Sequence, residues 1–335
     1  MMDLKNISIL IGFVLMLLSI TMTGINKKIN VDLFMDIKRN SSLGQLSDKS
    51  FFEEAHYYVK KKGDVPFYLN AKKIIMNPGK EEISFVKPRG AIFQLDSDKF
   101  FYEAERGYLD QKKKILFLKS KVKINSVDME LKSENFVYFF SKMKAELQGK
   151  VKTKIFSLKT GDKVFIDSQK FVFLGNKQET FIYSGKVRGR IKRKKVYEEG
   201  LSFNSKKLYF YKGKLKTHLE GKVLLKYKNF EAKAQSGDIF LENYNKSLKY
   251  FVLYDDVKVR ERLILRGRKV VRKAFSERLE GFPGKSQVIL TGYPKVLQEE
   301  DAIVGNKIIL RWNNEVLEII DANSNLKLKS NKHKK

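Results

Sequence analysis

Six segments of this chain repeat one short pattern, in which apolar and charged residues alternate along an extended stretch. Residues 147–155 (LQGKVKTKI) place Leu147, Gly149 and Val151 at odd positions, and lysine occupies most of the even ones. Because successive side chains of a strand point to opposite faces, this alternation predicts a half-buried β-strand. The pattern recurs roughly every 30 to 37 residues, a period typical of stacked supersecondary units.

The repeats are variations on the form L-x-G-x-V, and a more apolar strand and a polar turn precede each of them. They are LFLKSKVKI at 116–124, LQGKVKTKI at 147–155, YSGKVRGRI at 183–191, LEGKVLLKY at 219–227, LYDDVKV at 253–259 and LTGYPKV at 290–296. The preceding strands, such as FVYFF at 136–140, are apolar on both faces. We therefore expect an all-β, antiparallel sheet whose lysines lie on a solvated outer face.

The apolar face of the repeats is the candidate binding surface. Its glycines predict either a bulge that curves the sheet or a gap left for a ligand. The sheet could fill its interior like a sandwich or splay open as an apolar groove, and periodicity does not separate these two forms. The groove candidates are Leu118, Val122, Leu147, Val151, Tyr183, Val187, Leu219, Val223, Leu253, Val257 and Leu290.

The amino-terminal region predicts a membrane anchor. Residues 7–25 contain no charged residue and approach the ~20 residues that span a bilayer as a helix. No A-x-A motif follows, which favours a retained anchor over a cleaved signal peptide. A turn-rich connector comes next, and residues 50–62 within it could form a short helix or an edge strand.

The net charge of the chain limits the kinds of partner that it is expected to bind. The formal net charge is +30, which favours nucleic acid, anionic lipid head groups or acidic glycans as partners, although a lysine-rich composition explains it equally well. The cations are spread along the chain, which argues against nucleic acid. The chain has no cysteine, so disulfides, thiolate metal sites and cysteine nucleophiles are excluded.

No motif of catalysis is present. The three histidines are distant in sequence, and neither HExxH nor G-x-S-x-G occurs. Gly284-Lys285-Ser286 resembles the end of a phosphate loop, but Leu279 stands where that loop needs glycine, so a turn is expected. We predict no enzyme activity, no metal and no cofactor, and we expect His218 to be an exposed residue of a strand.

Two parts of the chain resemble lipopolysaccharide-transport families. Residues 288–298 (VILTGYPKVLQ), 302–310 (AIVGNKIIL) and 314–328 resemble the LptA/OstA family, in which a strand L-x-G-x-P-x-V precedes a strand I-x-G-x-x-I. The matching residues are Leu290, Gly292, Pro294, Val296, Ile303, Gly305 and Ile308. The layout of one anchor followed by strands, including residues 69–71, 102–104 and 109–122, resembles the LptC family.

The resemblance implies a twisted, V-shaped β-jelly roll whose open apolar groove holds acyl chains of lipopolysaccharide. It implies docking by edge strands to other Lpt jelly-roll proteins, with residues 308–310 and 316–320 as candidates, and energy from the inner-membrane ABC transporter complex of the Lpt system. The expected division is anchor 1–28, connector 29–64, LptC-like part 65–175 and LptA/OstA-like part 176–330.

The expected function is that of a lipid carrier anchored once in the inner membrane, with most of the chain in the periplasm and no nucleic-acid partner. One alternative is an envelope adaptor without a lipid cavity. Another is an exported enzyme or glycan-binding module that uses the basic outer face.

Overall fold

A computed structural model describes most of the chain after residue 49. The described ranges are 50–59, 67–76, 81–93, 99–156, 161–175, 179–194, 200–211, 214–241, 248–265, 267–299, 301–311 and 317–325. No helix within these ranges is long and apolar enough to cross a membrane. The anchor predicted over residues 7–25 lies outside them.

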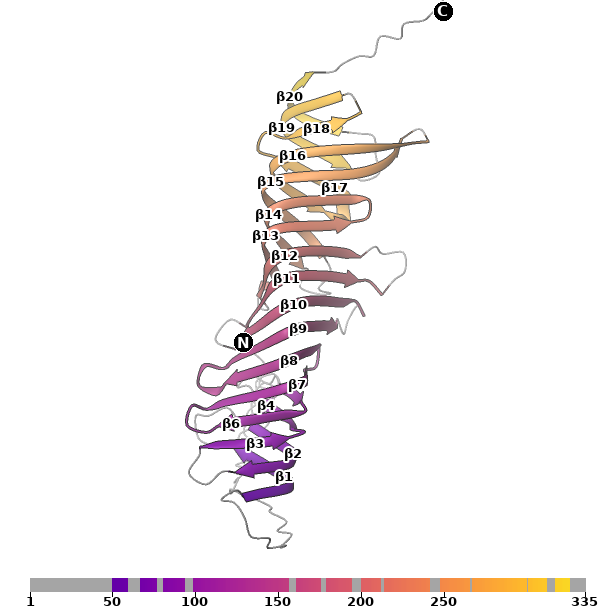
Figure 1. The fold of residues 1–335 in the computed structure, drawn as a ribbon. Helices are drawn as coiled ribbons and strands as arrows, with labels where there is room; N and C mark the ends of the chain where they lie inside the picture. The colour runs from indigo at the N-terminus through magenta and orange to yellow at the C-terminus, as the bar shows by residue number, and fades with distance from the viewer. Residues whose placement is uncertain are drawn as a thin grey trace, which may run out of the picture. The chain divides into compact units, whose positions relative to one another are not determined.

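The described residues form one antiparallel sheet of 20 strands, so the prediction of an all-β, antiparallel fold is confirmed (Figure 1). The strands of the amino-terminal half are β1 (Ser50–Val59), β2 (Phe67–Met76), β3 (Glu82–Val86), β4 (Arg89–Phe93), β5 (Lys99–Glu103), β6 (Arg106–Asp110), β7 (Ile115–Asn125), β8 (Met129–Phe139), β9 (Lys144–Phe156) and β10 (Lys163–Leu174). The others are β11 (Thr180–Lys192), β12 (Leu201–Tyr211), β13 (Lys216–Tyr227), β14 (Phe230–Leu241), β15 (Leu248–Leu265), β16 (Arg268–Phe282), β17 (Gln287–Thr291), β18 (Lys295–Gln298), β19 (Asp301–Arg311) and β20 (Leu317–Asn325). Two short 3-10 turns, Phe140–Lys142 and Pro283–Lys285, join β8 to β9 and β16 to β17.

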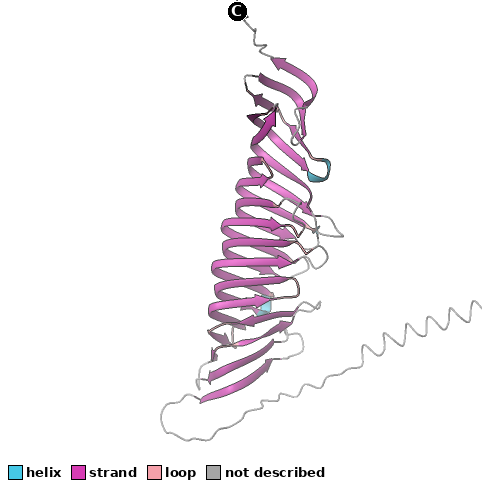
Figure 2. Ribbon diagram, turned by 90° about the vertical axis from the view of Figure 1, so that its right-hand side faces the viewer, coloured by secondary structure: helices cyan, strands magenta, loops and turns pink. Residues whose placement is uncertain are grey.

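From β7 to β16 each strand pairs with the next one in the sequence, so the long strands stack as successive rungs (Figure 2). The segments 147–155, 183–191 and 219–227 lie within β9, β11 and β13, as the alternation predicted. Residues 290–296 do not form the single strand expected of them, because β17 ends at Thr291 and β18 begins only at Lys295.

A β-bulge interrupts every second long strand near its middle. At each bulge two consecutive residues have positive φ, and the bulged strand carries one residue more than its neighbour. The pairs are Ser120–Lys121, Gly149–Lys150, Gly185–Lys186, Gly221–Lys222 and Asp255–Asp256, and Gly292–Tyr293 takes the same place between β17 and β18. The glycines of the repeat are therefore bulge residues, which was the first of their two predicted roles.

A buried serine faces each of four of these bulges from the neighbouring strand. Its hydroxyl donates to the backbone carbonyl two residues further on, at 2.8–3.1 Å. These serines are Ser133, Ser168, Ser205 and Ser276. The residue that follows each serine covers the bulge glycine where one is present, as Gln169 covers Gly185. The hydrogen bond thus holds the partner strand in the shape that the bulge requires.

The bulges divide the sheet into two walls. We call the strand segments on one side of the bulges wall A and those on the other side wall B. Wall A holds residues 115–119, 135–139, 144–148, 170–174, 180–184, 207–211, 216–220, 236–240 and 250–254, and wall B holds 122–125, 129–133, 151–156, 163–168, 187–192, 201–205, 223–227, 230–234 and 257–265. At the amino-terminal end the short strands β3 and β6 extend wall A, and β4 and β5 extend wall B.

The inner faces of the two walls meet in one hydrophobic core. Phe100 of wall B lies against Phe173 of wall A, with ring centroids 5.5 Å apart, although their strands are not neighbours in the sheet. The lysines at alternate positions, such as Lys152 and Lys222, are exposed on the outer side, as expected. A single sheet, folded along its bulges, therefore encloses its own interior.

Several finer expectations differ from the structure. Residues 50–59, left open between helix and strand, form the edge strand β1. Residues 308–310 were candidates for edge docking, but they lie in β19, which pairs with β17 and β20 on its two sides. Phe136–Phe139 is not equally buried on both faces, because Phe136 and Tyr138 are buried and Val137 and Phe139 are only half-buried. The boundary predicted at residues 175/176 falls between β10 and β11, which pair directly, and the division into two parts stays a prediction.

Candidate lipid groove between the two walls

An apolar groove lies between wall A and wall B, from about β8 to β15. Its volume is about 360 Å³, within the range of about 300–1,000 Å³ typical of sites for small ligands. Wall A contributes Phe181, Tyr183, Leu208, Phe210, Thr217 and Ile239, and the pair Leu241 and Leu248 lies just beyond its outer end. Wall B contributes Met129, Ile155, Phe156, Val164, Ile166, Ile191 and Phe203. The groove therefore offers aliphatic and aromatic surface from both sides.

The interior is filled nearer the amino-terminal end of the sheet. There Ile92, Phe100 and Tyr102 of wall B face Tyr138 and Phe173 of wall A across a void of only about 20 Å³. A water molecule needs about 10–15 Å³, so this region has almost no free space. The structure thus combines a packed interior at one place with an open one further along, whereas the sequence left these two forms as alternatives.

The eleven residues predicted for the groove all point to the interior, and each is at most 1% exposed. Only Tyr183 of them lines the open groove, and Leu147 lines the filled void. The others, such as Val151 and Val223, lie beside the bulges, where the walls join and the core is closed. Their role in lipid binding stays a prediction, and the open groove is lined mainly by residues that the repeat pattern did not single out.

Polar groups gather at the edge of the groove. The Arg193 guanidinium contacts the Asp162 carboxylate at 2.7 Å, and the Lys194 backbone N–H donates to the same carboxylate at 2.9 Å. Ser126 donates to Asp128 at 3.2 Å in the turn between β7 and β8. The charged residues thus lie at the edge of the groove and the apolar side chains lie inside it. This arrangement suits an amphiphile with a polar head and an apolar tail.

One tyrosine hydroxyl lies deep in this interior. The Tyr183 hydroxyl and the nearby Thr153 hydroxyl are both buried, and neither completes a hydrogen bond with another group of the protein. Burial raises the pKa of Tyr183, and the proximity of Thr153 lowers it by less. Tyr183 therefore stays neutral at any physiological pH, and the groove carries no charge at this depth.

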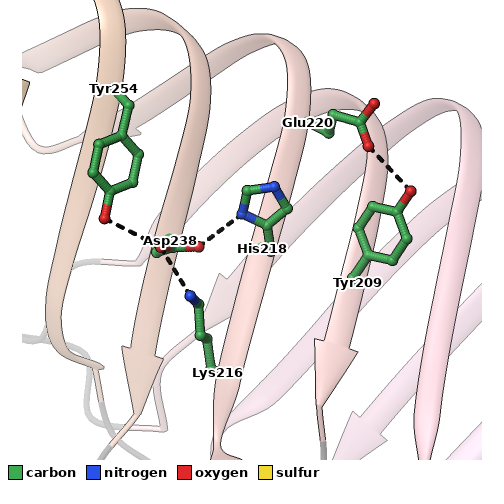
Figure 3. Close-up of polar contacts among 6 residues, drawn as sticks. All are labelled: Tyr209, Lys216, His218, Glu220, Asp238 and Tyr254. Carbon is green, nitrogen blue, oxygen red and sulfur yellow. Dashed lines mark hydrogen bonds and ion pairs between the residues drawn. The ribbon is translucent and has the colours of Figure 1, made fainter. Parts of the chain in front are cut away.

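A polar cluster on the outer face of wall A was missed by sequence reasoning (Figure 3). The Asp238 carboxylate, whose side chain is 8% exposed, contacts His218 Nδ1 at 2.8 Å and Lys216 Nζ at 3.0 Å. The Tyr254 hydroxyl donates to the same carboxylate at 3.2 Å, and burial together with the charge of Asp238 raises the pKa of Tyr254. His218 was expected to be exposed, but it is half-buried because Asp238 lies directly across the strand pair.

This outer cluster joins strands rather than forming a site for chemistry. Asp238 has three partners, from β13 and β15 on its two sides, so its carboxylate is engaged on the sheet surface. On the same face Tyr209 donates to Glu220 at 3.0 Å, and burial and that carboxylate raise the pKa of Tyr209. No group of three His, Cys, Asp or Glu suited to hold a metal ion occurs in the part of the chain that the structure describes.

Together, the fold and the groove define a class: an all-β protein whose folded antiparallel sheet encloses an apolar cleft. Residues 13–164 match the model of the LptC family, described as lipopolysaccharide-assembly, LptC-related. The resemblance to an LptC/LptA-like family is thereby confirmed, and it covers the first part of the chain.

The chain is also similar to a solved structure of LptH, the LptA-homologous periplasmic component of the conserved lipopolysaccharide transport device from Pseudomonas aeruginosa. The likeness has a TM-score of 0.32 at 13% identity, and it covers 36% of this chain and 80% of that one. A likeness at this level adds nothing to the family match. Among curated proteins, none matches this sequence.

Proposed function

We propose that this protein carries lipopolysaccharide by holding its acyl chains in the groove between wall A and wall B, without catalysing a reaction. The observation that carries the proposal is the open apolar groove of about 360 Å³ in a chain whose first part is LptC-related. Transfer of an acyl chain from water to such a surface gains about 0.8 kcal/mol per methylene, so apolar walls alone supply the affinity.

The proposal includes a position for the carrier in the cell envelope. In this proposal the apolar residues 7–25 anchor the protein in the inner membrane, and the sheet lies in the periplasm. The lipid would come from the inner-membrane ABC transporter complex and pass toward the outer membrane. No nucleic acid takes part.

Edge strands offer a route for that passage. Among the described strands, β1 pairs with β2 alone and β20 pairs with β19 alone, so each leaves one edge of backbone groups for another sheet. Exposed apolar residues lie on both edges, with Phe51 at 59% and Ile320 at 46% exposure. Docking of other Lpt jelly-roll proteins at these edges would extend the two walls from one protein to the next.

Site-specific photocrosslinking in cells tests the proposal. A photoreactive residue at Thr217, which lines the groove, is compared with one at Glu220, which lies on the outer face of the same strand. We expect lipopolysaccharide adducts from position 217 and none from 220. A second variant, Thr217→Trp, fills the groove and should lower the adducts formed from a photoreactive residue at Leu241 several-fold.

Two results would contradict the proposal. Equal labelling from positions 217 and 220 would show contact with lipid that does not depend on the groove. The absence of adducts from 217 and 241 in folded, exported protein would favour an envelope adaptor that binds only proteins.

A further inference from the structure

The hairpin of β15 and β16 reaches beyond the ends of its neighbours (Figure 1). Its register continues to the pair Leu265–Arg268, whereas β14 ends its pairing with β15 at Phe230–Glu261. On the other side, β18 ends its pairing with β16 at Arg272–Gln298. Residues 262–265 and 268–271 therefore form a two-stranded extension, which we call the ribbon.

A buried ion pair holds the base of the ribbon. The Arg272 guanidinium contacts the Glu261 carboxylate at 3.3 Å, both side chains are 1% exposed, and Arg272 Nε donates to Gln298 at 2.9 Å. On the same inner face of the ribbon, Leu263 and Val270 are buried. The ribbon thus has one face packed onto the protein, and only its outer face remains available to a partner.

The outer face of the ribbon and its base alternates cations with exposed apolar side chains. The cross-strand pairs are Lys258–Phe275, Arg260–Lys273, Arg262–Val271 and Ile264–Lys269. Three of these four pairs therefore join a cation to an apolar residue, and the exposures of Ile264, Val271 and Phe275 are 75%, 38% and 37%. The second pair places two like charges opposite each other, which destabilises a sheet, and Glu231 of β14 lies across from Arg260 on its other side.

The charge of this segment is one-sided. Eight of the residues from 258 to 275 are lysine or arginine, and Glu261 is the one acid among them. Glu261 and Arg272 neutralise each other in the interior, and Lys258 contacts Asp256 at 2.8 Å. Arg262, Lys269 and Lys273 face outward beside exposed apolar side chains, and Arg260 faces outward opposite Glu231 of β14. The surface therefore keeps an excess of positive charge, and it suits a partner that is both anionic and able to receive aliphatic groups.

We propose that the outer face of this hairpin binds an anionic phospholipid membrane, with its cations on head-group phosphates and Ile264 and Val271 at the boundary of the acyl region. Basic residues interleaved with exposed apolar ones are the pattern of interfacial membrane binding. Single-stranded nucleic acid would call for aromatic side chains on which bases stack, and the tip of the ribbon carries aliphatic residues instead. This contact is independent of the groove and of its occupant.

The absence of cysteine from the chain permits a direct test. The full-length protein carries Ile264→Cys labelled with an environment-sensitive fluorophore. It is held in nanodiscs of neutral lipid, so that its apolar amino-terminal segment is already in lipid before vesicles are added. Vesicles of phosphatidylcholine alone, or with a third of phosphatidylglycerol, are then added. We expect a blue shift and at least a twofold gain in emission with the anionic vesicles only, and none from a label at Lys152→Cys on the outer face of β9.

Charge variants locate the contact. Arg262→Gln with Lys273→Gln should weaken vesicle binding about tenfold, whereas Lys150→Gln with Lys152→Gln, which removes two exposed cations elsewhere, should leave it unchanged. Circular dichroism verifies that both variants fold. The proposal is overturned if the label at 264 does not respond to anionic vesicles, if both pairs of substitutions weaken binding equally, or if an oligonucleotide without vesicles produces the same response.

Discussion

The bulge at Gly185 offers a quantitative test of how the sheet folds along its length. Gly185 has φ of +78°, in the left-handed region that side chains disfavour. Gln169 of the neighbouring strand covers it, and a Cβ at residue 185 would lie 2.8 Å from the Gln169 Cβ. Gly185→Ala therefore introduces both backbone strain and a steric clash.

The two costs can be estimated separately. Left-handed backbone costs an L-residue about 1–2 kcal/mol. Overpacking adds about 1–3 kcal/mol, because Gln169 Cβ belongs to a paired strand and cannot move freely. The free energy of unfolding should thus fall by about 2–5 kcal/mol in total.

Gly267 supplies the matched control. Its φ is +77°, but no atom lies within 4 Å of the position of an added Cβ, so Gly267→Ala introduces the strain without the clash. Urea unfolding followed by far-ultraviolet circular dichroism gives both free energies, and Gly267→Ala should cost only about 1–2 kcal/mol. Equal losses for the two variants, or a loss below 1 kcal/mol at Gly185, would refute the view that the covering residue fixes the bulge.

Three further substitutions probe buried polar groups. Glu261→Ala removes the carboxylate beside the buried Arg272 and should cost about 3–5 kcal/mol in urea unfolding, and Glu261→Leu with Arg272→Met should recover most of it. Burial raises the pKa of Glu146, but two lysines at 2.6 and 2.9 Å outweigh this and hold it below 4.5. The ionised Glu146 carboxylate therefore adds to the free energy of unfolding above pH 4.5, and this stabilisation is lost as the pH falls below that value. Glu146→Gln should lower the free energy of unfolding by about 1 kcal/mol at neutral pH and leave it unchanged in strong acid. Tyr183→Phe removes a hydroxyl without a completed hydrogen bond, so the free energy of unfolding should change by less than about 1 kcal/mol. A larger loss would show that the Tyr183 hydroxyl does form a hydrogen bond in the folded protein.

The strands themselves could be predicted because one face of the sheet is exposed to solvent and the other is buried. In β13, Leu219 and Val223 are buried whereas Glu220 and Lys222 are exposed, as the alternation requires. The alternation has the same form in wall A and in wall B, however, and nothing in it shows that the two walls face each other. The contact of Phe100 with Phe173 depends on the folding of the whole sheet, so no local pattern predicts it.

The pairing of His218 with Asp238 shows a second limit, which is set by a single residue. Beyond the turn at 228–229, Tyr227 pairs with Phe230 and Val223 with Ala234, and this register would place Ile239 opposite His218. The extra residue of the bulge at Gly221–Lys222 shifts the register, so that Asp238 is opposite instead. A shift of one residue exchanges the two faces of a strand, so the outer cluster could be predicted only with the bulge placed correctly.

The opening of the groove is a feature that the alternation does not predict. Where the interior is filled, phenylalanine and tyrosine from the two walls meet across it, as Phe100 and Phe173 do. The open groove also has aromatic residues on both walls, such as Phe181 of wall A and Phe203 of wall B. Aromatic side chains therefore line both the filled part and the open part, so the type of residue that faces inward does not decide whether the interior is closed. Alternation determines which residues face inward, whereas the space that remains for an acyl chain depends on how the whole folded sheet places its two walls.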